Sequence, residues 1–145
     1  MIGARLHHAS LSVAALDPAV AFFETVFGYA VEVREDGMTD IAVMAGEAGL
    51  SCDFVQMRGP AGGVVLEVIC FHRAGGAMAA DAAPWRPGAG HVAFHVADFD
   101  AALRACAEAG AEVIGAPIDW PGGRAAYLKV PGGAFVEIEW LKGQG

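Results

Sequence analysis

The hydrophobic and polar positions near the N-terminus follow two periods in succession. Residues 5–13 alternate between polar and apolar side chains, which is typical of a strand with one buried face. A helix is predicted next, because Asp17-Pro18 suits a helix N-terminus and the apolar positions up to Phe27 recur at helical spacing. Gly28 is a typical helix end. These residues are therefore predicted to form a strand, followed by a helix that covers one face of a sheet.

The rest of the first half is predicted to be mainly strands. Strands are expected over 29–34, 50–57 and 64–71, and the polar sequence Glu35-Asp36-Gly37 is expected to be the turn that ends the first of them. Residues 38–45 suit either a short helix or a strand, with a helix favoured.

The second half repeats this order. His8 and His91 each open an alternating stretch, and an Asp follows each at the same spacing, Asp17 and Asp100. The expected elements are a helix over 98–109, capped by Asp98 or Asp100, and strands over 90–96, 112–118, 124–130 and 134–141. Each half therefore reads βαβββ, and the chain is predicted to be a duplication.

Residues 72–89 are rich in Ala, Gly and Pro and show no sustained period, so they are predicted to link the two halves. The predicted organisation is a first module over 1–71 and a second over 90–145. With 145 residues and 55% hydrophobic content, the two modules are expected to share one core in a single α+β domain.

Composition excludes several classes of function. The net charge of −8, with only nine Lys and Arg residues, argues against binding to nucleic acid. No apolar stretch approaches the roughly 18 residues of a membrane span, and the N-terminus lacks a secretory pattern, so a cytoplasmic protein is expected. The three cysteines show no CxxC spacing, and Cys70 and Cys106 lie in apolar elements, so neither a disulfide framework nor a catalytic thiol is predicted.

The candidate chemistry lies at matched positions of the repeat. Each half has a Gly-Gly pair followed four residues later by a glutamate, Glu67 or Glu137, in addition to its histidine, His8 or His91. Two imidazoles and two carboxylates suit Zn, Ni, Co, Mn or Fe(II), and a six-coordinate ion would keep two open positions. His7 is expected on the opposite strand face with no role.

Five further residues are candidates for binding a substrate. Ser10 and Ser12 share the strand face of the first histidine, and His95 shares that of the second, where it suits either an acid-base group or the solvent end of the strand. Arg124 suits either a substrate anion or a solvated rim, and Tyr127 suits a cavity wall or the core.

The sequences LHHASLSV, GGVVLEV, GHVAFHV and YLKVPGGAFVEIE resemble the vicinal oxygen chelate superfamily, which includes glyoxalase I, methylmalonyl-CoA epimerase, extradiol dioxygenases, and fosfomycin- and bleomycin-resistance proteins. The resemblance covers nearly the whole chain except the linker. It implies two βαβββ modules whose mixed sheets curl into an open barrel around a divalent metal, with ligands at the positions of His8, Glu67, His91 and Glu137. It also implies a homodimer, and the ligands meet either within one chain or between two.

The leading hypothesis is a metal-dependent isomerase or lyase of the glyoxalase or epimerase type. A small-molecule substrate would chelate the metal through neighbouring oxygens, and the metal would stabilise an enediolate-like anion. The resemblance implies that Glu137 or Glu67 also acts as the base. The alternatives are an Fe(II) extradiol-type dioxygenase, a thiol transferase that modifies an antibiotic, and a non-catalytic protein that binds an antibiotic or another small molecule.

Overall fold

The computed structural model describes residues 2–73 and 83–144. The first module consists of β1 (His8–Ser12), α1 (Leu16–Phe27), β2 (Ala30–Met38), α2 (Ile41–Ala45), β3 (Leu50–Arg58) and β4 (Val65–Arg73). The second consists of β5 (Val92–His95), α3 (Phe99–Glu108), β6 (Glu112–Trp120), β7 (Gly123–Lys129) and β8 (Phe135–Leu141).

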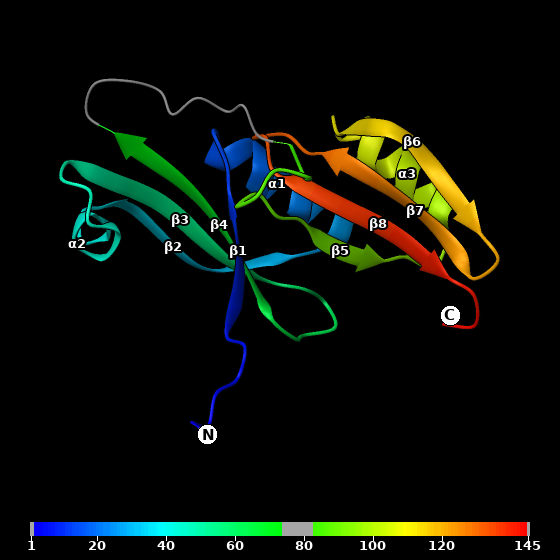
Figure 1. The fold of residues 1–145 in the computed structure, drawn as a ribbon, viewed down its shortest axis with the longest axis horizontal. Coiled ribbons are helices and arrows are strands. Elements are labelled where there is room, and N and C mark those ends of the chain that lie inside the picture. Colours follow the sequence, from blue (N-terminus) through cyan, green and yellow to red (C-terminus); the bar gives the residue numbers. More distant parts are fainter. Residues whose placement is uncertain (1, 74–82, 145) are drawn as a thin grey trace.

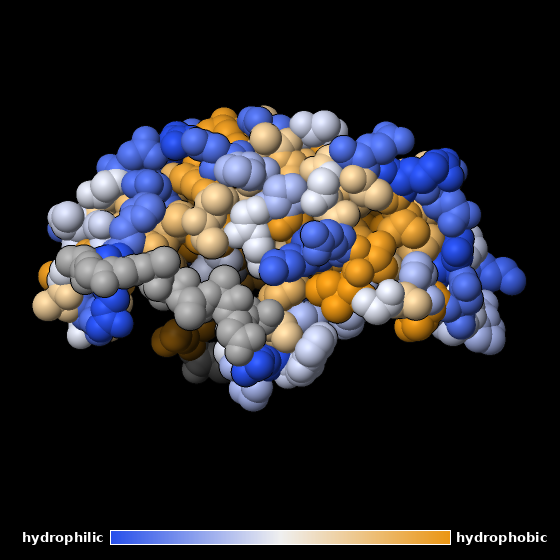
Figure 2. All heavy atoms as spheres, turned by 90° about the horizontal axis from the view of Figure 1, so that it is seen from above, coloured by the Kyte–Doolittle hydropathy of each residue, from blue (hydrophilic) through white to orange (hydrophobic). Residues whose placement is uncertain are grey.

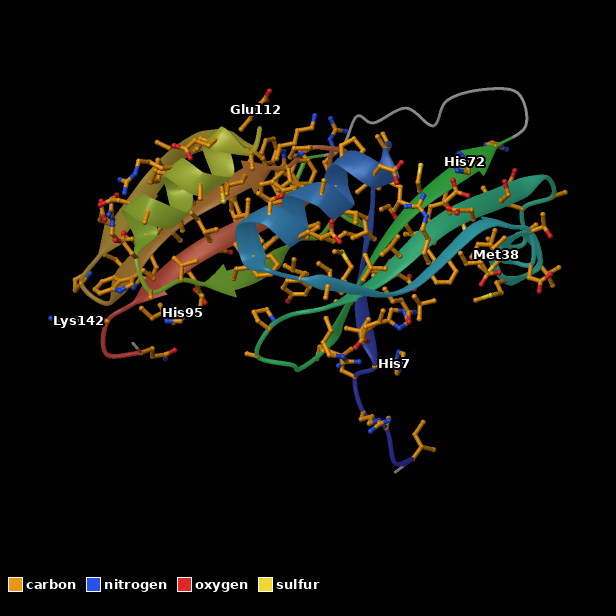
Figure 3. The ribbon with its side chains drawn as sticks, turned by 180° about the vertical axis from the view of Figure 1, so that it is seen from behind. His7, Met38, His72, His95, Glu112 and Lys142 are labelled. Carbon is orange, nitrogen blue, oxygen red and sulfur yellow. The ribbon has the colours of Figure 1, made fainter. Side chains whose placement is uncertain are left out.

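Each module forms one four-stranded mixed sheet, and the two sheets have the same topology. The strand orders are β1-β4-β3-β2 and β5-β8-β7-β6, in which the β1–β4 and β5–β8 pairs are parallel and the other pairs antiparallel. The sheets lie beside each other and do not close into one barrel (Figure 1). Helices α1 and α3 lie on the same side of the two sheets (Figure 3). The predicted α+β fold of two repeated modules is confirmed.

The shared core lies between the sheets and these helices. Successive residues of a strand point to opposite faces, so the fully buried Val68 of β4 and Val136 of β8 face the helices, whereas the neighbouring Glu67 and Glu137 face the other way. Phe23 of α1 is also fully buried in this core. The faces of both sheets away from α1 and α3, called the helix-free faces below, therefore carry Glu67 and Glu137.

The turn between β7 and β8 packs closely against α1. Gly132 has a positive φ of 88°, and its carbonyl accepts a hydrogen bond of 2.8 Å from the backbone N–H of Ala14. A Cβ at Gly132 would lie 2.5 Å from the carbonyl oxygen of Ala15, so only glycine fits this contact. This glycine joins the second module to the first.

Aromatic rings form a second junction between the modules. Phe94 of β5 stacks on Phe27 of α1 with ring centroids 4.0 Å apart and an interplanar angle of 10°. Phe23 and Tyr29 lie 6.1 and 5.9 Å from the same ring. Because both partners of the stacked pair are apolar and come from different modules, this aromatic cluster holds the two sheets together.

We predict that Phe94→Ala lowers the free energy of unfolding by about 3 kcal/mol, because it removes the ring that three aromatic side chains of the first module contact. Chemical denaturation monitored by circular dichroism measures the loss. The matched control is Trp85→Ala, whose ring is 75% exposed and should change the stability by less than about 0.5 kcal/mol. Equal losses in the two variants would contradict the assigned role of the cluster.

Some local predictions are confirmed and others are wrong. Gly28 ends α1 with a φ of 65°, the carboxylate of Asp98 accepts a hydrogen bond from the N–H of Ala101 at the start of α3, and residues 41–45 are helical. Asp17 does not cap α1: Ala15 occupies that position, and Asp17 lies in the first turn and pairs with Arg34.

The turn expected at Glu35-Asp36-Gly37 is also wrong, because β2 continues through these residues to Met38. The strand accommodates them with a register shift between Glu35 and Met38, at which Gly37 has a φ of 70° and donates its N–H to the carboxylate of Asp53. The short helix α2, which the sequence favours, lies between β2 and β3 of the first βαβββ module.

Residues 74–82 of the predicted linker lie outside the described part of the chain, and residues 83–89 contain turns. All three cysteines are free and buried, and burial raises the pKa of the Cys106 thiol to about 11. No helix in the described ranges is long and apolar enough to cross a membrane.

Candidate metal centre

The first half-site lies on the helix-free face of the first sheet. His8 is the first residue of β1, and Glu67 lies in the middle of the adjacent parallel strand β4. The Nε2 atom of His8 and the Oε1 atom of Glu67 are 3.9 Å apart. The glutamate side chain is 13% exposed, and its other oxygen accepts a hydrogen bond of 3.1 Å from the amide nitrogen of Gln56 on β3.

The second half-site repeats this arrangement on the second sheet. His91 immediately precedes β5, and its Nε2 atom is 3.1 Å from Oε2 of Glu137 in the adjacent strand β8. Tyr127 is the direct cross-strand partner of Glu137, and its ring lies edge-on to the His91 ring at 4.8 Å. A recess of about 140 Å³ adjoins Glu137 and is lined mainly by Ile114, Ala116, Ile118, Ala125 and Tyr127.

The two half-sites do not meet within one chain. In residues 2–73 and 83–144, no three His, Cys, Asp or Glu side chains are grouped closely enough to hold a metal ion. Each module thus supplies one imidazole and one carboxylate in contact. The set of four ligands stays a prediction.

Besides Tyr127, two of the predicted substrate-binding residues, Ser10 and Ser12, lie close to the half-sites. Ser10 lies directly opposite Glu67 in the β1–β4 pairing and therefore shares its face. Ser10, Ser12 and His91 line a cavity of about 480 Å³ where β1 and the start of β5 approach each other. Figure 2 shows apolar side chains at the surface between hydrophilic ones on the face seen from above.

His95 lies on β5 beyond the second half-site. Its cross-strand partner is Glu139, two residues beyond Glu137, and its Nε2 atom is 2.5 Å from the carbonyl oxygen of Gln144. Figure 3 shows His95 beside the C-terminal end of the chain. The structure therefore places this imidazole against the C-terminal segment.

The structure does not bring Arg124 to the half-site. Its guanidinium lies 4.5 Å from the centre of the Phe99 ring and hydrogen-bonds to Asp100 and Asp119. The hydrogen bond to Asp100 holds the pKa of the guanidinium above its usual value. Phe99 and Asp100 belong to α3, so Arg124 is on the helix-covered face and is bound to acidic partners.

Two residues that the sequence pattern does not indicate contact the predicted ligands. Gln56 is one, and the other is His7, whose Nδ1 atom is 2.9 Å from Nδ1 of His8. His7 was expected on the opposite strand face, but β1 begins at His8, so strand alternation does not fix the side chain before it. Gln56 lies directly opposite Glu67 because β3 and β4 pair antiparallel in this register. The register would have been needed to find Gln56 from the sequence.

The residues of both half-sites fit a divalent metal ion. Imidazole nitrogen and carboxylate oxygen are donors that Zn, Ni, Co, Mn and Fe(II) accept, and the Nε2 atoms of both histidines face carboxylate oxygens. The four side chains are only partly exposed, between 13% and 39%. A cation between them would offset the free-energy cost of removing the carboxylates from water.

A family model described as the glyoxalase/bleomycin resistance protein/dioxygenase superfamily matches residues 5–138. Among solved structures, a glyoxalase family protein from Bacillus cereus has a TM-score of 0.80 at 23% identity, over 96% of this chain and 95% of that one. A comparison with curated proteins found no significant match.

Two other solved structures have more specific names. Lactoylglutathione lyase from Agrobacterium tumefaciens has a TM-score of 0.61 at 22% identity, over 95% of this chain and 94% of that one. A mutant of the fosfomycin resistance protein FosX from Listeria monocytogenes, complexed with Mn(II) and a dihydroxypropylphosphonic acid, has a TM-score of 0.64 at 16% identity, over 95% and 92%. At these identities the likeness shows a common fold. Because the family model covers most of the sequence, this chain belongs to the glyoxalase/bleomycin resistance protein/dioxygenase superfamily.

Proposed function

We propose that this protein is a metal-dependent isomerase or lyase that moves a proton at a carbon next to two neighbouring substrate oxygens. The observation that carries the proposal is the pair of matched His–Glu contacts, 3.9 Å in the first module and 3.1 Å in the second, on the helix-free faces of both sheets. A binding protein that relied on apolar contacts alone would have no need for both pairs.

The complete site is proposed to form between two copies of the chain. His8 and Glu67 of one copy would face His91 and Glu137 of the partner subunit, because one chain holds only two donors in each group within its described residues. The sheets are open on the faces that carry these residues (Figure 1). A symmetric dimer would build two identical sites in this way.

A divalent ion bound by these four residues would act as a Lewis acid toward the negative charge that develops on the two substrate oxygens. Glu137 is proposed to remove the proton and to return it to the adjacent carbon. Its carboxylate adjoins the recess formed by Ile114, Ala116 and Ile118, in which an apolar part of the substrate would be shielded from water.

Addition of the metal ion tests the proposal independently of the substrate. We expect Zn²⁺, Ni²⁺, Co²⁺ or Mn²⁺ at about 100 times its dissociation constant to raise the free energy of unfolding by about 2.7 kcal/mol, because it binds only the folded state. Chelation with EDTA should reverse the gain. The variant in which both His8 and His91 are changed to Ala should show no gain.

Thermal denaturation measures the gain in stability, and elemental analysis of the dialysed protein measures the bound metal. Binding of less than about one tenth of a metal ion per chain for all four ions, with no change in melting temperature, would overturn the proposal and favour the non-catalytic alternative.

A further inference from the structure

The two half-sites differ at one repeated position. Gln56 on β3 and Tyr127 on β7 are the direct cross-strand partners of Glu67 and Glu137, so they occupy the same place in the two modules. Gln56 donates its amide N–H to the carboxylate, whereas the Tyr127 ring packs against His91. The duplication has therefore preserved the carboxylates but not the groups opposite them.

The contact with Gln56 fixes the orientation of the first carboxylate. Because Oε2 of Glu67 accepts the amide N–H at 3.1 Å, Oε1 is the oxygen that faces Nε2 of His8. The distance of 3.9 Å between these atoms exceeds that of a hydrogen bond. The two atoms that would bind the metal thus face each other without a hydrogen bond between them.

His7 fixes the imidazole of the same half-site. Its Nδ1 atom is 2.9 Å from Nδ1 of His8, and one of the two nitrogens must carry the proton that they share. When His8 is the donor in this bond, its Nε2 atom has a free lone pair on the side of Glu67. A bond from the second ring nitrogen is what orients a ligand histidine and sets its tautomer.

The second half-site is held differently. The Nε2 atom of His91 is 3.1 Å from Oε2 of Glu137. The Tyr127 ring contacts the imidazole edge-on. Within the described part of the chain, Glu137 has no counterpart of the Gln56 amide. Its carboxylate is thus the one that can turn away from a common centre.

We propose that Gln56 and His7 are positioning residues that preset His8 and Glu67 as the anchor for the divalent ion, while Glu137, which has no counterpart of the Gln56 amide among the described residues, is left free to act on the substrate. This inference rests on the proposed function, because it assumes that the half-sites bind a metal. It divides the four ligands into a fixed pair and a pair with a mobile carboxylate. It also assigns a role to two residues outside the ligand set.

The test is titration of the full-length protein with Co²⁺, followed by calorimetry and by the visible absorption spectrum of the bound ion. We expect Gln56→Met, which keeps the chain length but lacks the donor, and His7→Ala each to weaken Co²⁺ binding by about 10- to 100-fold. The absorption bands should shift in both variants, because they report the geometry of the ligands. His7→Asn, whose side-chain carbonyl can accept from His8, should recover part of the affinity.

His72→Ala is the matched control for a histidine deletion. His72 pairs with Asp53 at 2.8 Å, and Figure 3 shows it at the opposite end of the first sheet from His7. Its loss should leave Co²⁺ affinity and spectrum unchanged. The melting temperature of each variant without metal separates loss of fold from loss of affinity.

Two outcomes would contradict the inference, and they have different meanings. If the unaltered protein binds Co²⁺ and both variants bind it with the same affinity and spectrum, the positioning role is wrong and the proposed function stands. If the unaltered protein binds none of Zn²⁺, Ni²⁺, Co²⁺ and Mn²⁺ while its fold is intact, the proposed metal site and the inference both fail.

Discussion

Glu137→Gln should reduce the exchange of a substrate α-proton with deuterated water by about 10²- to 10⁴-fold, which is the usual contribution of a general base. The amide has nearly the shape of the carboxylate and keeps one oxygen donor, but it cannot take up a proton. Glu137 lies beside the apolar recess, and among residues 2–73 and 83–144 it has no hydrogen bond like the one from Gln56 to Glu67, so it is the carboxylate best placed to move.

The measurement is nuclear magnetic resonance of the α-proton signal in deuterated water. Glutathione hemithioacetals and acyl-CoA thioesters are the first substrates to screen. Glu139→Gln is a matched control, because Glu139 lies two residues farther along β8 and on the same face. Exchange is compared with Co²⁺ at a saturating concentration, because Glu137→Gln also removes the charge of a proposed ligand and should weaken Co²⁺ binding, whereas Glu139→Gln should not. Normal exchange by Glu137→Gln together with loss of exchange by Glu67→Gln would transfer the role of base to Glu67.

Repetition explains why the ligand candidates were predictable from the sequence. His8 with Glu67 and His91 with Glu137 each occupy equivalent places in a strand pair, and an internal repeat reveals such pairs without knowledge of the fold. The same repeat predicted the order of the main strands and helices. The glycine ends and the Asp98 cap were predictable because they depend only on local backbone geometry.

The missed contacts depend on features that the repeat does not contain. Gln56 and Tyr127 differ in type, so their shared position became visible only with the strand register. His7 lies before the first strand, where alternation gives no direction to its side chain. Residues 35–37 have the composition of a turn, but a register shift and a hydrogen bond to Asp53 keep them within β2.

Arg124 shows what strand alternation adds to the choice between its two predicted roles. Arg124 and Tyr127 are three residues apart on one strand, so alternation alone places their side chains on opposite faces of the sheet. Tyr127 contacts His91, and Arg124 pairs with acidic residues on the helix-covered side. On a regular strand the two residues cannot belong to the same site. Counting positions along 123–129 would therefore have excluded one of them.

A mixture of His8→Ala and Glu137→Ala chains should recover about one quarter of the exchange activity of the unaltered protein after the subunits are unfolded and refolded together. Each variant alone should be inactive. In a mixed dimer, one site combines both defects, whereas the other combines the intact first module of the Glu137→Ala chain with the intact second module of the His8→Ala chain. Half of the dimers are mixed after random pairing, and half of their sites are intact.

The same experiment distinguishes sites shared between subunits from sites within one chain. If a single chain closed its two sheets around the metal, every chain in the mixture would carry a defect, and no activity would return. The control is a mixture of His8→Ala with Glu67→Ala chains, whose defects fall in the same module and so leave no shared site intact. Recovery in the first mixture but not in the control would require the first module of one subunit to work with the second module of its partner. That result would explain why each sheet brings one imidazole and one carboxylate together, while no three His, Cys, Asp or Glu side chains among the described residues are grouped so that they could hold a metal ion.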